Sequence, residues 1–167
     1  LGLPALWDRD GSSSGIGFHG LMGRGAWGGD GASAEQPVHP TAYSKALLGW
    51  LTPQVVTAPE TGASLPAVET NASAREFRRA SSCAHQEYFL LENRQPTGFD
   101  AGLPGDGLLV WHADERVDTN DDESRPRVAL LPADDVFGLD NDRNAGDGGD
   151  PWPGTADARS WDDDTSP

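Results

Sequence analysis

The stretch EYFLLENRQPTGFDAGLPGDGLLVWHADE, residues 87–115, decides the fold. Within it, EYFLLEN (87–93) and GLLVWHA (107–113) are short runs of aromatic and aliphatic residues with a period of two, which is typical of β-strands. A segment rich in Gly and Pro, residues 94–106, connects them. RVALL (127–131) predicts a third strand, which a proline stops. These runs together predict an antiparallel β-rich portion.

The strongest helix signal lies upstream of the strands, in HPTAYSKALLGWL, residues 39–51. Pro40 suits the first turn of a helix and Gly49 suits its end. The predicted buried face consists of residues at three- and four-residue spacing, namely Ala42, Tyr43, Ala46, Leu47 and Trp50. A helix followed by strands predicts an α+β fold. The turn-forming residues 57–66 predict a boundary between a portion 1–56 and a portion 57–167.

Composition narrows the class of protein. The 167 residues include 21 Gly and 13 Pro, which excludes a helical bundle or a coiled coil. A net charge of -15 with few aliphatic residues is typical of disorder, but six Trp and dense apolar segments favour a loop-rich globular chain. No apolar run approaches the ~18 residues of a membrane span. The acidic surface should repel nucleic acid and anionic lipid, so neither is expected as a partner. The single cysteine, Cys83, excludes an internal disulfide.

Two acidic segments are candidate cation sites. In the run Asp8-Arg9-Asp10-Gly11-Ser12, oxygen ligands alternate before a Gly, which suits calcium, although the same residues are typical of an ordinary Asp-Gly turn. Asp8 and Asp10 are the predicted metal ligands. The segment 139–150 suits either a calcium loop or a solvated acidic loop. Its oxygen-bearing side chains are Asp140, Asp142, Asn144, Asp147 and Asp150.

The histidines offer weaker signals, because the sequence contains no HExxH zinc motif. His112-Ala113-Asp114 offers two ligands to a metal, or else His112 bonds to a neighbouring strand. His39, at the start of the predicted helix, is interpreted as a helix cap or as a packing partner of Trp50.

Four blocks of sequence follow one another along the chain. They are LGLPALWDRDGSSSGIGFHGLMGRGAWGG (residues 1–29), HPTAYSKALLGW, the stretch 87–115 and GDPWPG. In order and spacing, these blocks resemble the immune inhibitor A-type secreted metallopeptidases. In that family, HExxHxLGLPDxYD runs through a Gly/Ser stretch into an (S/D)LMxxGxW turn. The resemblance covers residue 1 to about residue 155.

The resemblance implies an exported, extracellular zinc metalloendopeptidase that cleaves protein or peptide substrates, with structural calcium as a further metal. Residues 1–56 would be the C-terminal part of a metzincin-like catalytic domain. In the family, two His one helical turn apart hold zinc, and the Glu between them is the general base for the attacking water. Those three residues are expected just upstream of Leu1, so the isolated chain is expected to be inactive.

The resemblance assigns supporting roles to residues of this chain. Gly2 would end the zinc-binding helix, Met22 would lie in the turn beneath the zinc, and the helix around 43–50 would pack against the catalytic core. The metzincin-like pattern HExxHxxGxx(H/D) places its third ligand at Ala5, which cannot bind zinc. Either another residue supplies the ligand, with Asp8 the nearest, or the chain is a non-catalytic homologue that acts as a calcium-stabilised binding module.

An acidic, calcium-stabilised β module without peptidase ancestry is a third reading of the sequence. On the peptidase reading, the N-terminal segment is expected to expose apolar side chains when the upstream part is missing. These side chains are Leu3, Leu6, Trp7 and Phe18.

Overall fold

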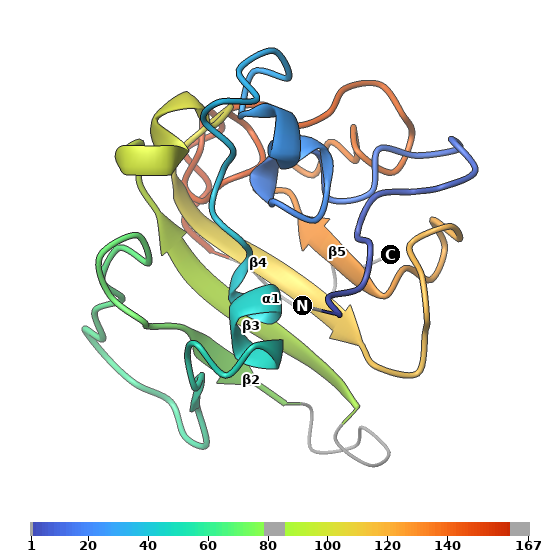
Figure 1. The fold of residues 1–167 in the computed structure, drawn as a ribbon. Helices are drawn as coiled ribbons and strands as arrows, with labels where there is room; N and C mark the ends of the chain where they lie inside the picture. The colour runs from blue at the N-terminus through green and yellow to red at the C-terminus, as the bar shows by residue number, and fades with distance from the viewer. Residues whose placement is uncertain (1, 79–85, 161–167) are drawn as a thin grey trace.

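The computed structural model describes residues 2–78 and 86–160, and its centre is a five-stranded mixed sheet (Figure 1). The strands lie side by side in chain order and are β1 (Gln54–Val55), β2 (Arg75–Phe77), β3 (Glu87–Arg94), β4 (Gly107–Asp114) and β5 (Val128–Leu131). β1 pairs with β2 in parallel, and every other neighbouring pair is antiparallel. The three strands predicted from the sequence are confirmed as β3, β4 and β5, whereas β1 and β2 were not predicted.

Successive side chains of a strand point to opposite sides of the sheet, and the two faces pack against different residues. Leu90 of β3 lies opposite Trp111 of β4, which lies opposite Leu130 of β5, and all three face the N-terminal residues. That core cluster also contains Leu6, Ile16, Tyr43, Leu109, Ala113, Val128 and Leu139. The opposite face carries a smaller cluster of Phe89, Val110 and Leu131, with Phe77, Leu91 and Trp152 against it.

The N-terminal residues form an irregular layer in front of the sheet (Figure 1). This layer contains two short 3-10 helices, η1 (Gly17–His19) and η2 (Arg24–Trp27), and the helix α1 (Ala42–Leu47), which contacts β3. A further 3-10 helix, η4 (Gly98–Gly102), lies in the connection between β3 and β4. A mixed sheet with few helices is compatible with the predicted α+β class. The layer and the strands share one core, and the division at residues 56 and 57 stays a prediction.

The helix α1 is shorter than the predicted span of 39–51. Thr41 is its N-cap, and its Oγ1 accepts a hydrogen bond of 3.2 Å from Ser44 N. The interpretation of His39 as the cap was therefore wrong, and Pro40 lies before the helix instead of in its first turn. Gly49 follows the C-cap with a φ of +69°, as a helix-terminating glycine does.

The predicted apolar face of the helix is only partly correct. Ala42 and Tyr43 are fully buried, but Leu47 is 47% exposed and Trp50 is 56% exposed. The helix ends before it completes two turns, so residue 47 is its last residue and residue 50 lies beyond it. His39 lies against Phe99, with ring centroids 6.0 Å apart, and this ring contact differs from the predicted packing on Trp50.

Within residues 2–78 and 86–160, no helix is long and apolar enough to cross a bilayer. Cys83 lies outside these described residues.

Candidate functional site

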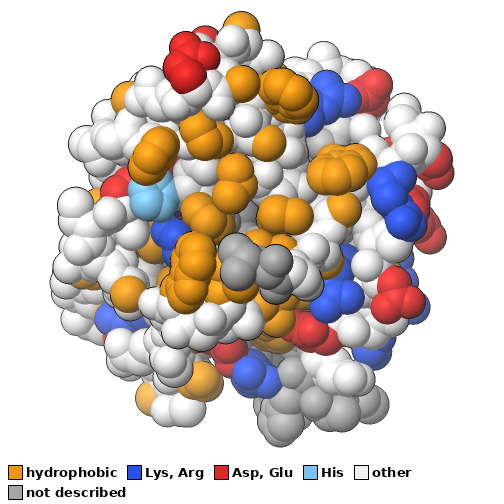
Figure 2. All heavy atoms as spheres, viewed as in Figure 1, with side chains coloured by type: hydrophobic (Ala, Val, Ile, Leu, Met, Phe, Trp, Pro, Cys, Tyr) orange, Lys and Arg blue, Asp and Glu red, His pale blue; other side chains and the backbone are white. Residues whose placement is uncertain are grey.

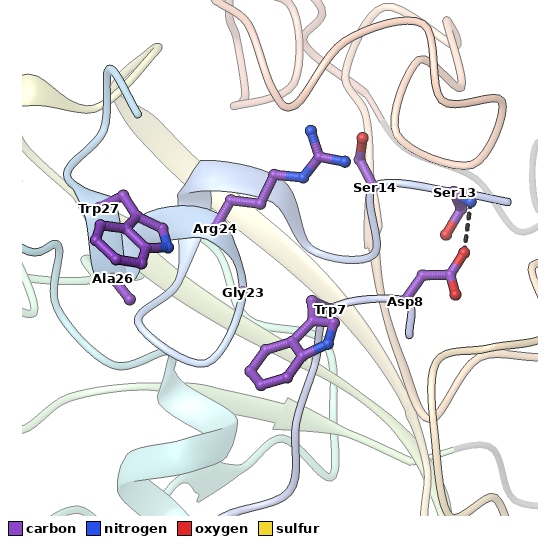
Figure 3. A pocket seen from close by; sticks show the side chains of 8 residues that line it. All are labelled: Trp7, Asp8, Ser13, Ser14, Gly23, Arg24, Ala26 and Trp27. Carbon is purple, nitrogen blue, oxygen red and sulfur yellow. Dashed lines mark hydrogen bonds between the residues drawn. The ribbon is translucent and has the colours of Figure 1, made fainter. Parts of the chain in front are cut away.

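A pocket of about 550 Å³ opens between two loops of the N-terminal layer (Figure 3). It lies on a face where hydrophobic side chains gather (Figure 2). We call it the Trp7–Trp27 pocket. Its lining residues are Trp7, Asp8, Ser13, Ser14, Gly23, Arg24, Ala26 and Trp27. Its volume lies within the range of small-ligand sites in proteins.

The first wall of the pocket is a closed loop that is built around the carboxylate of Asp8. Oδ1 accepts hydrogen bonds from Asp10 N (2.8 Å) and Gly11 N (3.3 Å), and Oδ2 accepts from Ser12 Oγ (3.0 Å) and from Ser13 N. Burial alone would raise the pKa of Asp8, but these hydrogen bonds outweigh it and hold the pKa well below its ordinary value. The carboxylate therefore stays ionised and fixes the loop.

The base of the same loop depends on Gly15. Ile16 N donates a hydrogen bond of 3.1 Å to Leu6 O, which closes the loop where the chain returns. Gly15 has a φ of +54°, and a Cβ there would lie 2.4 Å from Leu6 O and 2.8 Å from Trp7 Cα. Only glycine allows the two ends of the loop to approach this closely.

The second wall is the turn that contains Met22 and η2. Leu6 N donates a hydrogen bond of 2.9 Å to Met22 O, which joins this turn to the first wall. The Met22 side chain is partly buried and packs against the core cluster of Leu6, Ile16 and Trp111. Val38 N donates to Gly25 O at 3.0 Å and holds η2 from the other side. Both walls are therefore fixed to the core and to each other.

A shared aspartate lies behind the rim of the pocket. Ser14 Oγ donates to Asp142 Oδ1 at 2.9 Å, and Arg24 Nη2 lies 3.5 Å from the same oxygen. Within the described residues, this is the one polar contact of the Arg24 side chain. The guanidinium group thus keeps most of its donors for a ligand.

Of the four N-terminal apolar residues that were expected to be exposed, only Trp7 is exposed. Leu6 was expected to be exposed, but it is fully buried, because it packs on the sheet beside Ile16 and Trp111. Leu3 and Phe18 are half-buried. Trp7 is 45% exposed and Trp27 is 63% exposed, so the pocket presents two large apolar surfaces to solvent.

The predicted metal ligands lie in the first wall. Asp8 is occupied by its own loop, and Asp10 Oδ1 accepts a hydrogen bond of 3.1 Å from Ser12 N. In the segment 139–150, Asp142 serves Ser14, while Asp150 Oδ2 lies 3.1 Å from His19 Nε2. Among the described residues, no three His, Cys, Asp or Glu side chains are grouped so that they could hold a metal ion. Both cation sites stay predictions.

His112 has a partner on the neighbouring strand. Its Nε2 lies 3.1 Å from Glu87 Oε1 on β3, and its ring lies 5.1 Å from that of Phe89. Asp114 accepts instead from the guanidinium groups of Arg116 and Arg125. The reading of His112 as a histidine that bonds to an adjacent strand is confirmed.

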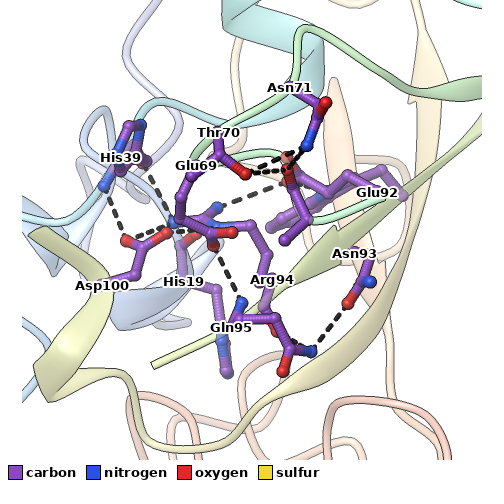
Figure 4. A network of polar contacts seen from close by, with 12 residues as sticks. His19, His39, Glu69, Thr70, Asn71, Glu92, Asn93, Arg94, Gln95 and Asp100 are labelled. Carbon is purple, nitrogen blue, oxygen red and sulfur yellow. Dashed lines mark hydrogen bonds and ion pairs between the residues drawn. The ribbon is translucent and has the colours of Figure 1, made fainter. Parts of the chain in front are cut away.

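A buried polar network lies between the N-terminal layer and β3 (Figure 4). Arg94 is fully buried, and its Nε and Nη2 each donate a hydrogen bond of 2.7 Å to the carboxylate of Asp100. Its Nη1 also donates to His19 O at 3.1 Å, and its Nη2 lies 3.4 Å from His39 O. The guanidinium group therefore ties two loops of the layer to the sheet.

The network carries several further buried charges. Glu92 Oε1 accepts a hydrogen bond of 2.8 Å from Trp111 Nε1, and Glu69 Oε1 lies 3.5 Å from Arg94 Nε. Burial raises the pKa of Glu69 and lowers the pKa of Lys45. Burial alone would raise the pKa of Asp100, but the hydrogen bonds and charge of Arg94 hold it below its ordinary value.

Sequence reasoning missed this network, although a signal was present. Glu92 and Arg94 stand two residues apart in β3, so both point to the same face. Leu90 lies on the same face of β3 and belongs to the core cluster. Two opposite charges on the buried face of a strand indicate a paired interior site, because an unpaired buried charge is costly.

The lowered pKa of Asp8 predicts a loss of stability in acid. A carboxyl group whose pKa is lower in the folded state than in the unfolded state stabilises the fold at pH values above its unfolded pKa of about 3.8. This contribution is lost as the pH falls below that value. When the pH is lowered from 5 to 2.5, the melting temperature of the native protein should therefore fall further than that of the Asp8→Asn variant. Thermal melts across this range measure the difference. Asp106→Asn, at an exposed position, is the control for the loss of one negative charge. Equal losses in Asp8→Asn and in the native protein would contradict the prediction.

Comparisons of this chain with protein-family models, with curated proteins and with solved structures find no match.

Proposed function

We propose that this chain is the part of a secreted zinc metalloendopeptidase, of the immune inhibitor A type, that follows the zinc-binding helix. The enzyme would hydrolyse peptide bonds in extracellular proteins. In this proposal, the chain does not supply the general base. It supplies the support beneath the catalytic site and a surface that faces the substrate.

The hydrogen bond between Leu6 N and Met22 O is the observation that carries the proposal. It places the methionine turn directly against the segment that starts at Gly2. In the family that the sequence resembles, this is the segment that leaves the zinc helix, and the methionine lies beneath the metal. The partly buried Met22 side chain, packed on the core, suits such an apolar floor.

The conformation of Gly2 gives further support. Its φ is +74°, in the left-handed region that helix-terminating glycines adopt. A Cβ at this position would meet no atom within 4 Å, so the backbone conformation is the only requirement for glycine there. A glycine at this position with this φ suits a chain that leaves a helix and turns toward the second wall of the pocket.

The described residues do not fit a zinc site by themselves. Asp8, the nearest candidate for the missing third ligand, accepts hydrogen bonds from four residues of its own loop. Ala5 has no ligating atom. The zinc ligands would therefore lie upstream of Leu1, and the described residues would support the site without taking part in the reaction.

The test begins with the coding sequence upstream of Leu1. We expect an HExxH motif that ends two residues before Leu1, and a longer protein that includes it should bind zinc and cleave casein. Replacing the glutamate of that motif by glutamine should abolish cleavage and retain zinc, while the 167-residue chain alone should be inactive. An upstream sequence without paired histidines would refute the proposal, as would zinc-dependent casein cleavage by the 167 residues alone.

A second candidate function is a non-catalytic homologue that acts as a calcium-stabilised extracellular binding module. Ala5 and the internally bonded Asp8 favour it, because together they leave the third ligand position without a donor. In that case the longer protein should fold and show no peptidase activity. Its melting temperature should rise with calcium and fall with a chelator.

A further inference from the structure

The Trp7–Trp27 pocket combines exposed aromatic surface with a cation on a strongly acidic chain. Its two indoles are 45% and 63% exposed, whereas the core tryptophan Trp111 is fully buried. Exposed indoles that line one concave site are typical of recognition surfaces, because they gain contact area at a small cost in conformational entropy. Figure 3 shows the Arg24 side chain lying along the same site.

The hydrogen-bonding groups of the pocket indicate which ligand it can hold. The acceptors are occupied within the protein: Asp8 by its own loop, and Ser13 Oγ by Gly15 N at 3.1 Å. The hydroxyl of Ser14 is directed at Asp142. The groups with unused capacity are the Arg24 guanidinium and the indole N–H groups of Trp7 and Trp27, and all three are donors only. The pocket therefore suits a ligand that presents acceptors, such as peptide carbonyls or a carboxylate, beside an apolar body.

We propose that the Trp7–Trp27 pocket binds an extended peptide, with a large apolar side chain in contact with both indoles and an adjacent acidic side chain directed at Arg24. A sugar is less suitable, because its hydroxyl groups need acceptors as well as donors. The volume of about 550 Å³ accommodates a side chain such as phenylalanine together with the neighbouring backbone.

Hydrogen bonds within the protein fix both walls of the pocket before a ligand binds. The first wall is held by Asp8, the second by the bond from Val38 to Gly25, and the two are joined by the bond from Leu6 to Met22. A fixed site loses little conformational entropy when its ligand binds. The choice of a peptide as ligand rests on the proposed peptidase function. Binding is measured without cleavage, so each proposal can fail while the other stands.

The probe is N-acetyl-phenylalanyl-glutamic acid amide, titrated into the 167-residue chain. The indole N–H signals of Trp7 and Trp27 in a ¹H–¹⁵N spectrum, assigned with Trp7→Phe and Trp27→Phe, report binding. We expect both signals to shift and to saturate, while the signal of Trp50 stays unchanged. An alanine in place of the phenylalanine of the probe should weaken binding about tenfold, because it removes most of the contact with the indoles.

Matched variants separate the pocket from other exposed tryptophans. Trp27→Ala should weaken binding of the probe about tenfold, whereas Trp50→Ala, which removes an indole that is 56% exposed and outside the pocket, should leave it within about twofold. Arg24→Gln should remove the preference for the glutamic acid probe over its glutamine analogue and keep the preference for phenylalanine over alanine.

Three results would overturn the inference. The first is the absence of saturable shifts at Trp7 and Trp27 with the phenylalanine probe. The second is an equal loss of binding in Trp27→Ala and Trp50→Ala. The third is tighter binding of cellobiose than of the peptide at the same two indoles, which would make the pocket a carbohydrate site.

Discussion

The Arg94→Met variant is expected to lose about 3–5 kcal/mol of unfolding free energy, because breaking a buried ion pair leaves the partner charge without compensation. In the native protein, Arg94 donates two hydrogen bonds of 2.7 Å to Asp100. Its charge also faces Glu92, which is fully buried as well. Methionine fills a similar volume but offers neither donors nor charge. Urea unfolding followed by tryptophan fluorescence measures the loss.

Arg159→Met is the matched control, because this arginine is 78% exposed and pairs with the exposed Asp157. It should change the unfolding free energy by less than about 0.5 kcal/mol. Arg94→Lys keeps the charge but not the planar fork of donors, so its stability should lie between those of the native protein and Arg94→Met. Equal unfolding midpoints for Arg94→Met and Arg159→Met would contradict the role of the network.

Replacing Gly15 by alanine is expected to destabilise the protein by about 2–5 kcal/mol, from a left-handed backbone and a severe overlap together. The new Cβ would lie 2.4 Å from Leu6 O, and that atom is backbone, so it can yield only if the loop opens. Opening this loop separates Trp7 from the rest of its wall. The variant should therefore also lose the native chemical shift of the Trp7 indole.

Gly49→Ala separates the two causes. Gly49 also has a positive φ, of +69°, but a Cβ there would meet no atom within 4 Å. Its cost should be only that of the backbone conformation, about 1 kcal/mol. Chemical denaturation of both variants gives the comparison. If Gly15→Ala is no less stable than Gly49→Ala, the close approach of the two loop ends has no energetic importance.

The strands could be predicted because their signal is local. The predicted strands 87–93 and 107–113 match β3 (Glu87–Arg94) and β4 (Gly107–Asp114) to within one residue at each end. The helix was predicted in the right place but with the wrong ends, because the side chain of Thr41 caps the chain after Pro40. β1 and β2 have two and three residues, too few to show any period.

The site depends on contacts that no local pattern reveals. Arg94 and Asp100 are close in sequence, but the carbonyl groups of His19 and His39 that share the guanidinium are not. Trp7 and Trp27 share a pocket because the backbones of Leu6 and Met22 meet, which depends on the glycines between them. The metal sites are a different case: the zinc site rests on a resemblance and the two cation sites rest on local patterns of oxygen-bearing residues, and both stay predictions.

The position of Arg94 has a consequence for how the molecule opens. One guanidinium holds the carbonyl groups of His19 and His39 in the N-terminal layer and the carboxylate of Asp100 in the connection beyond β3. Lifting the layer off the sheet would break the contacts of Arg94 with both carbonyl groups, while the guanidinium group would stay paired with Asp100. These contacts favour the opening of the layer and the sheet as one cooperative unit, and we expect amide exchange in both to be limited by the same global event.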